Sequence, residues 1–284
     1  MMTFWKKTMP ALLFGTAGIP LSSKGLGTVE GIREVRRLGL GAMELEFVQS
    51  VNIRPEKAPG VRAAAQEEGV LLTCHAPYYI NLNAQEEEKR RASADRILNS
   101  ARVAAACGGW SVCFHGGYYM GMPHPIVFEK VKEALEDVTE TLRVEGTEIW
   151  IRPEIGGKTT SWGSLEEILE MSKQLPGILP CIDWAHLHAR SLGRNNTEAE
   201  FRAVLESMEN ALGREAIQNL HCHVEGIEIG KTGEKMHKNL EDSGLNYRVL
   251  VAVLKDFGGK GVVICESPNI EKDALLLQRA YQSL

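Results

Sequence analysis

Six side chains that can bind a metal ion stand near the ends of successive short apolar runs. They are His75, His115, Glu154, Asp183, His221 and Glu266. Imidazoles and carboxylates without thiolates suit a borderline divalent ion such as Zn²⁺, with Mn²⁺ as an alternative and Ca²⁺ or Mg²⁺ less suitable. Because six ligands exceed what one tetrahedral ion uses, the set indicates a dinuclear site in which one carboxylate bridges two ions.

Each of these residues has a simpler interpretation when it is taken alone. A strand-end histidine is often a hydrogen-bonded structural residue, and a strand-end Asp or Glu commonly caps the next helix. The shared position of all six favours a metal site, because charged groups are rarely buried without partners. His186 follows Asp183 by three residues and could reach the same ions. His221 and His223 face one side of a strand, so their spacing does not decide which of them is a ligand.

The elements that carry these residues must bring the ends of many strands together. Eight short runs of aliphatic and β-branched residues alternate with longer stretches of helical spacing. The predicted strands are residues 11–15, 42–47, 70–75, 110–115, 148–154, 178–183, 217–223 and 261–266. Eight such units in 284 residues predict an α/β fold, a closed (β/α)8 TIM barrel whose strands all end at one mouth. A doubly wound open sheet is the alternative, but FGTAGIP after the first strand lacks the G-x-G-x-x-G spacing of a dinucleotide-binding turn.

The composition of the chain limits what it can be. No linker or change of composition divides it, so we expect a single TIM-barrel domain over residues 1–284. The net charge of −5 argues against a non-specific nucleic-acid binder. Lys158, Lys231, Lys235 and Arg190 could still offer phosphates a local positive rim, although a solvated loop face is an equally good interpretation. Without a signal peptide or a membrane-spanning stretch, the protein is expected to be cytoplasmic. The six cysteines lack CxxC spacing and are expected to be buried, reduced thiols.

The segments around the candidate ligands also form a series. They are HAPYYINL (75–82), FHGG (114–117), RPEIGG (152–157), CIDWAH (181–186), LHCH with GIEIGKTGEKMH (220–237) and ICESP (264–268). In this order they resemble the endonuclease IV family of apurinic/apyrimidinic endonucleases, within the xylose-isomerase-like barrel superfamily. The resemblance covers residues 75–268, and HAPYYINL and CIDxxH are its more specific motifs.

The resemblance implies a zinc centre at the mouth of the barrel. One zinc would be held by His75, His115 and Glu154. Glu154 would also bridge to a second zinc, whose ligands would be Glu154, Asp183, His221 and Glu266.

A third ion is implied as well, with His186 and His237 among its ligands. The family has an aspartate two positions before that last histidine, whereas this chain has Lys235, whose ammonium group cannot bind a cation. A third ion therefore needs a substitute ligand, for which the candidates are Glu234, Glu228, His188 and His223.

Duplex DNA with abasic sites is the partner that the resemblance implies. In the family, an arginine and two bulky residues wedge into the helix and help to expose the abasic nucleotide. Tyr78 and Tyr79 match the bulky pair and would stack or intercalate. Their alternative role is packing over the barrel mouth. Asn52 stands at the position of the arginine, with Arg54 close by, so the match fails there.

The expected function is that of a zinc-dependent hydrolase, acting as a monomer, that cuts the DNA backbone on the 5′ side of an abasic site and leaves a 3′-hydroxyl. Glu154 would be the catalytic residue, because it bridges the ions and orients the nucleophile. The alternative is a sugar isomerase or epimerase of the same superfamily, with one ion and a carboxylate that moves a proton. His75 and His115 separate the two, since an isomerase has no need of a second ion. A barrel that binds without turnover is a third alternative.

Overall fold

Eight parallel strands form the centre of the computed structural model, which describes residues 9–284. Their hydrogen-bonded order is β5-β4-β3-β2-β1-β10-β7-β6. They are β1 (Leu12–Ala17), β2 (Ala42–Glu46), β3 (Leu71–His75), β4 (Ser111–Phe114), β5 (Trp150–Pro153), β6 (Cys181–Asp183), β7 (Leu220–Val224) and β10 (Gly261–Cys265). Two isolated parallel bridges, Ile151 with Ile178 and Glu154 with Cys181, join the two ends of this order. The strands therefore form a nearly closed barrel, and the predicted TIM barrel is confirmed.

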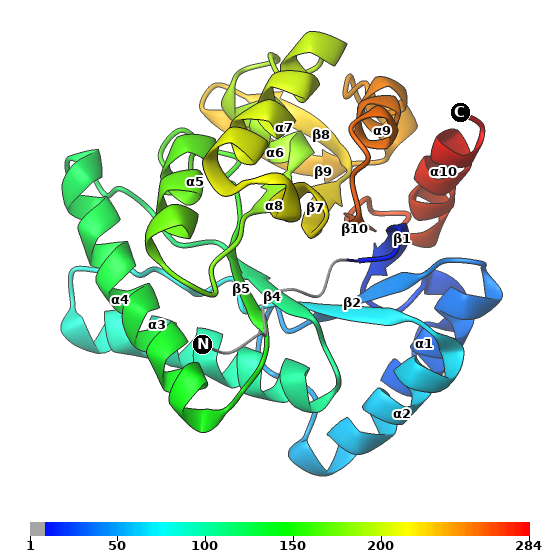
Figure 1. Ribbon diagram of the computed structural model, residues 1–284, viewed down its shortest axis with the longest axis horizontal. Helices are drawn as coiled ribbons and strands as arrows, with labels where there is room; N and C mark the ends of the chain where they lie inside the picture. The colour runs from blue at the N-terminus through cyan, green and yellow to red at the C-terminus, as the bar shows by residue number, and fades with distance from the viewer. Residues whose placement is uncertain (1–8) are drawn as a thin grey trace.

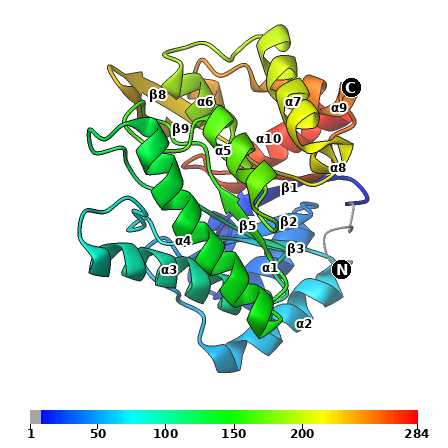
Figure 2. The ribbon, with the colours of Figure 1, turned by 60° about the vertical axis from the view of Figure 1, so that its left-hand side comes forward.

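Helices surround the barrel, as both ribbon views show (Figures 1 and 2). They are α1 (Thr28–Arg37), α2 (Ala58–Glu68), α3 (Glu87–Ala106), α4 (His124–Glu145), α5 (Leu165–Gln174), α6 (Trp184–Arg190), α7 (Glu198–Leu212), α8 (Arg214–Ile217), α9 (Tyr247–Asp256) and α10 (Glu271–Gln282). Short 3-10 turns lie at Leu21–Ser23, Pro55–Lys57 and Leu240–Asp242. Local chemistry sets several helix ends. Ser164 and Thr197 begin α5 and α7 with capping boxes, and α2 and α4 end at Gly69 and Gly146 in the left-handed conformation.

An antiparallel hairpin leaves the barrel after β7 and lies beside α6 (Figures 1 and 2). Its strands are β8 (Gly226–Gly230) and β9 (Gly233–Lys238). The backbone N–H of Glu234 donates to the carbonyl of Gly157 at 2.9 Å, and that of Thr159 donates to the carbonyl of Thr232 at 3.1 Å. A Cβ atom at Gly157 would lie 2.6 Å from the Glu234 carboxylate, so only glycine allows this approach. The hairpin is thus fixed to the loop after β5.

The interior of the barrel differs from the layer between strands and helices. That outer layer is apolar and contains four of the six cysteines, Cys74, Cys107, Cys222 and Cys265. Contacts between strands that are not neighbours must run through the interior. Some of them are apolar, among Ala42, Val262 and Ile264, and others are polar. The fully buried residues that make the polar contacts include Glu44, Ser111, Cys113, Arg152, His221 and His223. Branched aliphatic side chains are the usual filling of a TIM barrel, so the polar part of this interior is unusual.

Two further expectations can be compared with the structure. All six cysteines are buried and free, as the sequence predicted. No helix among residues 9–284 has both the length and the hydropathy needed to cross a membrane.

Candidate metal centre

The first group of ligands joins the ends of three neighbouring strands. His75 ends β3, while His115 and Glu154 follow β4 and β5. The Nε2 atoms of His75 and His115 lie 3.2 and 3.7 Å from Oε2 of Glu154. His75 Nδ1 lies 2.7 Å from the carbonyl of Ala76, which assigns its proton to Nδ1 and leaves Nε2 to face the carboxylate. The ligand atoms lie within 4.8 Å of one another, close enough to share one ion.

The second group uses the other oxygen of Glu154. His223 Nδ1 lies 3.2 Å from Glu154 Oε1 and 3.3 Å from Glu266 Oε1. Asp183 completes the group. Its Oδ1 accepts the backbone N–H of His186 at 2.7 Å, because Asp183 also begins α6 as its N-cap residue. Glu154 therefore presents one oxygen to each group, which is the arrangement of a bridging ligand.

His221 is not part of this second group, and the expectation that it binds there is corrected. Its Nε2 lies 3.0 Å from Glu44 Oε2, and its Nδ1 lies 2.8 Å from Ser111 Oγ. His221 and His223 point to the same side of β7, but two residues separate them by roughly 6.6 Å along the strand. His223 is therefore at the mouth, and His221 lies deeper in the barrel.

A third group consists of His186, Glu234 and His237. His186 Nε2 lies 3.5 Å from Glu234 Oε2, and His237 Nε2 lies 3.8 Å from Glu234 Oε1. In β9, Glu234 pairs with Ile229 and Met236 pairs with Glu228, so Lys235 is the extra residue of a β-bulge. In a regular strand Glu234 and His237 would face opposite sides, and the bulge brings them to the same side.

Glu234 is therefore the candidate that replaces the missing aspartate. The other three candidates have different partners. Glu228 forms ion pairs with Lys235 and Lys238, and His188 Nδ1 lies 2.8 Å from the carbonyl of Arg194. His223 belongs to the second group.

Charges at the mouth are strongly coupled. Burial alone would lower the pKa of His75, but the hydrogen bond and the charge of Glu154 raise it to about 10. Burial lowers the pKa of His115 to about 4 despite the nearby carboxylate. Burial would raise the pKa of Glu154, yet the charges of His115 and His223 hold it well below its usual range. Glu154 is therefore ionised and His115 is neutral at neutral pH, as metal ligands must be.

The residues of these groups fit divalent metal ions. The donors are nitrogen and oxygen atoms, which suit zinc and manganese. Asp183 Oδ2 and His186 Nε2 are buried and have no hydrogen-bond partner among residues 9–284. Polar atoms in that state are costly unless a ligand satisfies them. An ion in the second group would satisfy Asp183 Oδ2, and an ion in the third group would satisfy His186 Nε2.

Residues 32–283 match the xylose isomerase-like TIM barrel family. The chain belongs to this family. A protein of Methanocaldococcus jannaschii, named only as uncharacterized, is 42% identical over 96% of this chain and 98% of its own length. A probable endonuclease 4 of Staphylococcus carnosus is 25% identical over 60% of this chain and 56% of its own length.

Two solved structures have a similar fold and carry the names of different enzymes. Endonuclease IV from Thermus thermophilus has a TM-score of 0.69 and 22% identity, over 96% of this chain and 98% of that one. A D-tagatose 3-epimerase-like protein has a TM-score of 0.70 and 19% identity, over 90% of this chain and 94% of that one. The named relatives are enzymes, but the fold alone does not select between hydrolysis and epimerisation. The choice depends on the side chains at the mouth.

Sequence reasoning missed one carboxylate at the mouth of this family member. Glu225 directly follows β7 and is fully buried, with both oxygens lacking hydrogen-bond partners among the described residues. It forms a possible ligand group with Asp183 and His186. Burial and the nearby Asp183 raise the pKa of Glu225 well above its usual range. Its place just after LHCHV was the available signal, because charged residues at a strand end are candidates for the same mouth.

Tyr78 and Tyr79 lie on the exposed surface of the mouth. Their exposed fractions are 57% and 66%. The ring of Tyr78 packs edge-on to His75, with 5.3 Å between ring centroids. Tyr118 and Met120 are also exposed, and both contact Asn81 in the neighbouring loop. An exposed platform of flat and polarisable side chains thus lies beside the first ligand group.

Only two of the four basic side chains expected to form a positive rim are free to contact a phosphate. Arg190 donates to the carbonyls of Gly156, Lys158 and Ser161, so it holds the loop after β5. Lys235 is paired with Glu228. The Lys158 and Lys231 side chains are exposed and make no ion pair within the described part of the chain. Two lysines therefore remain to meet an anion.

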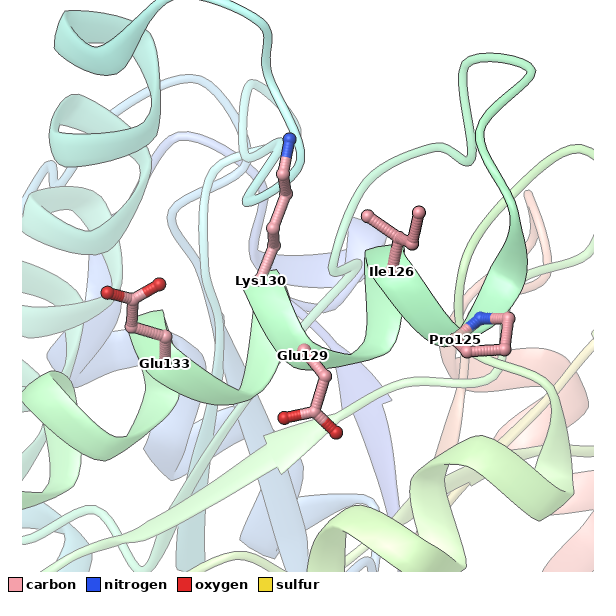
Figure 3. Close-up of a pocket in the computed structure, with 5 residues that line it drawn as sticks. All are labelled: Pro125, Ile126, Glu129, Lys130 and Glu133. Carbon is pink, nitrogen blue, oxygen red and sulfur yellow. The ribbon is translucent and has the colours of Figure 1, made fainter.

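A hollow on the outer surface of α4 is not connected with these groups (Figure 3). The residues that line it are Pro125, Ile126, Glu129, Lys130 and Glu133. It is open to solvent and contains none of the candidate ligands, so it takes no part in the site.

Proposed function

We propose that the protein is a divalent-metal-dependent phosphodiesterase of the endonuclease IV type, which hydrolyses the DNA backbone on the 5′ side of abasic sites. The observation that carries the proposal is the position of Glu154 between two ligand groups, with one carboxylate oxygen facing each. Two adjacent divalent ions, when bound, activate water as a nucleophile and stabilise the charge that develops on a phosphate. Zinc suits the nitrogen and oxygen donors.

The imidazoles from β3 and β4 favour hydrolysis over epimerisation. An epimerase of this fold needs one ion and carboxylates that move a proton next to a carbonyl. The second group alone, with Glu154, Asp183, His223 and Glu266, would serve that reaction. His75 and His115 have no role in it, yet both face Glu154. Their presence is best explained by a second ion beside the first.

Different residues at the mouth would bind the metal ions, the bases and the phosphates. Glu154 and Asp183 would hold the ions with His75, His115, His223 and Glu266. A third ion at His186, Glu234 and His237 would bind from the hairpin side. Tyr78 and Tyr79 would stack on bases next to the lesion, since base stacking tolerates any sequence. Lys158 and Lys231 would contact phosphates. We include in the proposal that the enzyme is cytoplasmic and acts as a monomer.

The test is a nicking assay on a duplex that carries one abasic-site analogue, with an identical undamaged duplex as the control. We expect a single metal-dependent cut on the 5′ side of the lesion, and a 3′-hydroxyl that a polymerase can extend. Absence of metal-dependent nicking at micromolar enzyme would refute the proposal. Incorporation of solvent deuterium into a ketose, without nicking, would instead support the epimerase.

A further inference from the structure

A different kind of ligand group lies inside the barrel, deeper than the mouth. It consists of Cys113 on β4, Cys181 on β6, and His221 and His223 on β7. One ligand atom from each residue lies within 4.8 Å of those of the others, and all four residues are fully buried. Cys113 and Cys181 are the two cysteines that do not belong to the apolar layer outside the barrel. None of the four groups described at the mouth contains sulfur.

The spacing of this group suits a tetrahedral ion. Zinc bonds of about 2.0–2.3 Å to nitrogen and sulfur place neighbouring ligand atoms roughly 3.3–3.8 Å apart. Cys113 Sγ and His223 Nε2 are separated by 3.7 Å. Glu44 on β2 adds a carboxylate, with Oε2 lying 3.0 Å from His221 Nε2 and Oε1 lying 2.8 Å from His223 Nε2.

The imidazoles are oriented as ligands would be. Metal-binding histidines usually have a hydrogen bond at the nitrogen that does not bind the ion. The Nδ1 atom of His221 lies 2.8 Å from Ser111 Oγ, so Nε2 is left to face the group. Neither His221 Nε2 nor Glu44 Oε1 has a partner in hydrogen-bonding geometry within residues 9–284, although both are buried. Both atoms instead lie at ion-pair distance from each other's side chains or from His223, so Glu44 and the two imidazoles form one buried cluster beside the cysteines.

Charge balance also favours a cation at this place. Buried charges are costly unless opposite charges accompany them. Arg152 lies buried in the same interior, and its hydrogen bonds go to Pro180 and Asn219 rather than to a carboxylate. A divalent ion together with Arg152 would balance two thiolates and the Glu44 carboxylate. Without the ion both cysteines are neutral thiols and Arg152 balances Glu44, so the ion would be what allows both cysteines to bind as thiolates.

We propose that the barrel interior contains a second metal site, in which Cys113, Cys181, His221 and His223 bind a zinc-type divalent ion with Glu44 as an additional donor. Closed sites with cysteine and histidine ligands are typical of structural zinc. Because no ligand is exposed, the ion has no open position for a substrate and stabilises the fold. It enters while the chain folds. His223 is shared with the mouth, since its Nε2 faces inward and its Nδ1 faces Glu154. With ions in both places it would bridge them as an imidazolate that has released both ring protons.

Cobalt substitution tests the proposal, because a thiolate bound to Co²⁺ produces a near-ultraviolet charge-transfer band that nitrogen and oxygen ligands do not produce. The reduced, metal-free full-length chain is refolded with Co²⁺. We expect this band in the wild-type protein. We also expect it in Glu154→Gln, because all four interior ligands remain in this variant even though Glu154 contacts Nδ1 of His223. X-ray absorption of the zinc-loaded wild type should show a sulfur shell at about 2.3 Å.

The variants locate the sulfur ligands. The double variant Cys113→Ser with Cys181→Ser should lose the band and one equivalent of cobalt relative to the wild type. Cys222→Ser is the matched control: it lies between the two histidines in sequence but packs in the apolar layer outside the barrel. It should retain the band.

The proposal is overturned if the refolded wild type has neither the cobalt band nor a zinc–sulfur shell. It is also overturned if the band persists in the double serine variant. The wild-type measurements show whether sulfur binds the metal even if the double variant does not fold. They do not depend on the nicking activity, so this inference and the proposed function can fail separately.

Discussion

The mouth of the barrel and its interior both gather metal-binding side chains, but in different ways. At the mouth the donors are nitrogen and oxygen, and His115 and His237 remain 33% and 28% exposed. In the interior two thiols join two imidazoles, and every side chain is fully buried. Strand β7 serves both regions with histidines two residues apart. If both proposals hold, depth along one strand separates an open, reactive centre from a closed, stabilising one, with His223 between them.

The largest effect on activity should come from Glu154→Gln, which removes a ligand at the mouth and leaves the four interior ligands in place. Loss of the carboxylate shared by two ligand groups should lower the nicking rate by about 10³-fold or more. Single-turnover assays on the abasic-site duplex measure this. The variant should also bind less metal. A variant with the wild-type rate would contradict the bridging role.

Removal of metal should expose the stabilising role of the interior. Metal at about 100 times its dissociation constant stabilises a fold by about 2.7 kcal/mol. For a domain of 284 residues that corresponds to a melting temperature roughly 4–5 °C higher. Thermal unfolding with and without a chelator measures the shift. The shift should largely survive in Glu154→Gln and disappear in the Cys113→Ser, Cys181→Ser variant, and the opposite pattern would reverse the comparison.

Glu234→Gln should have the next largest effect, and Lys235→Ala is its neighbouring control. Glu234 lies between His186 and His237, whereas Lys235 is the bulged residue paired with Glu228. We expect Glu234→Gln to lose one equivalent of metal and about 10- to 100-fold in activity, and Lys235→Ala to lose neither. Elemental analysis and the nicking assay measure both. Equal effects of the two changes would argue against Glu234 as the substitute ligand.

The pH dependence should differ between the metal-free and metal-bound protein. His75 has a pKa raised from 6.5 to about 10, so an ion must displace its proton. Metal affinity at the mouth should therefore rise by up to about tenfold per pH unit between these values. The stability that protonated His75 gives the metal-free protein is complete below pH 6.5 and is lost as the pH rises through about 10. Calorimetric titration and chemical unfolding over this range measure the two trends, and parallel trends would exclude His75 as the displaced acid.

Tyr78→Ala and Tyr79→Ala should have the smallest effect. Loss of about 1.4 kcal/mol of base stacking corresponds to roughly tenfold weaker binding of the duplex. We expect KM to rise and kcat to change little. Val144→Ala, an exposed position on α4, is the control. If the tyrosines only pack over the mouth, the variants will lose stability rather than affinity.

Much of the mouth could be predicted from sequence because its ligands follow strand ends. His75, His115, Glu154, Asp183 and Glu266 all lie in one region, and the strand pattern sets their register. The choice between His221 and His223 could not be made, since both face one side of β7 and only the sheet sets their depth. The role of Glu234 was also hidden, because a bulge changes the alternation of β9.

The interior group could not be predicted at all from local patterns. Cys113, Cys181 and Glu44 come from three strands that are far apart in the sequence, and cysteines without CxxC spacing looked like ordinary core residues. Glu44 stands in a short apolar run where its neighbours predict burial. Only the closure of the barrel brings these side chains to the two histidines.

The attachment of the hairpin to the loop after β5 determines which elements border one side of the barrel mouth. Backbone bonds at Gly157 and Thr159, and a glycine contact that tolerates no side chain, attach the hairpin to the loop after β5. The hairpin therefore bounds the mouth on this side. Because the loop after β5 is also bonded to the loop that carries Tyr118, the hairpin, this loop and Tyr118 form one connected side of the mouth.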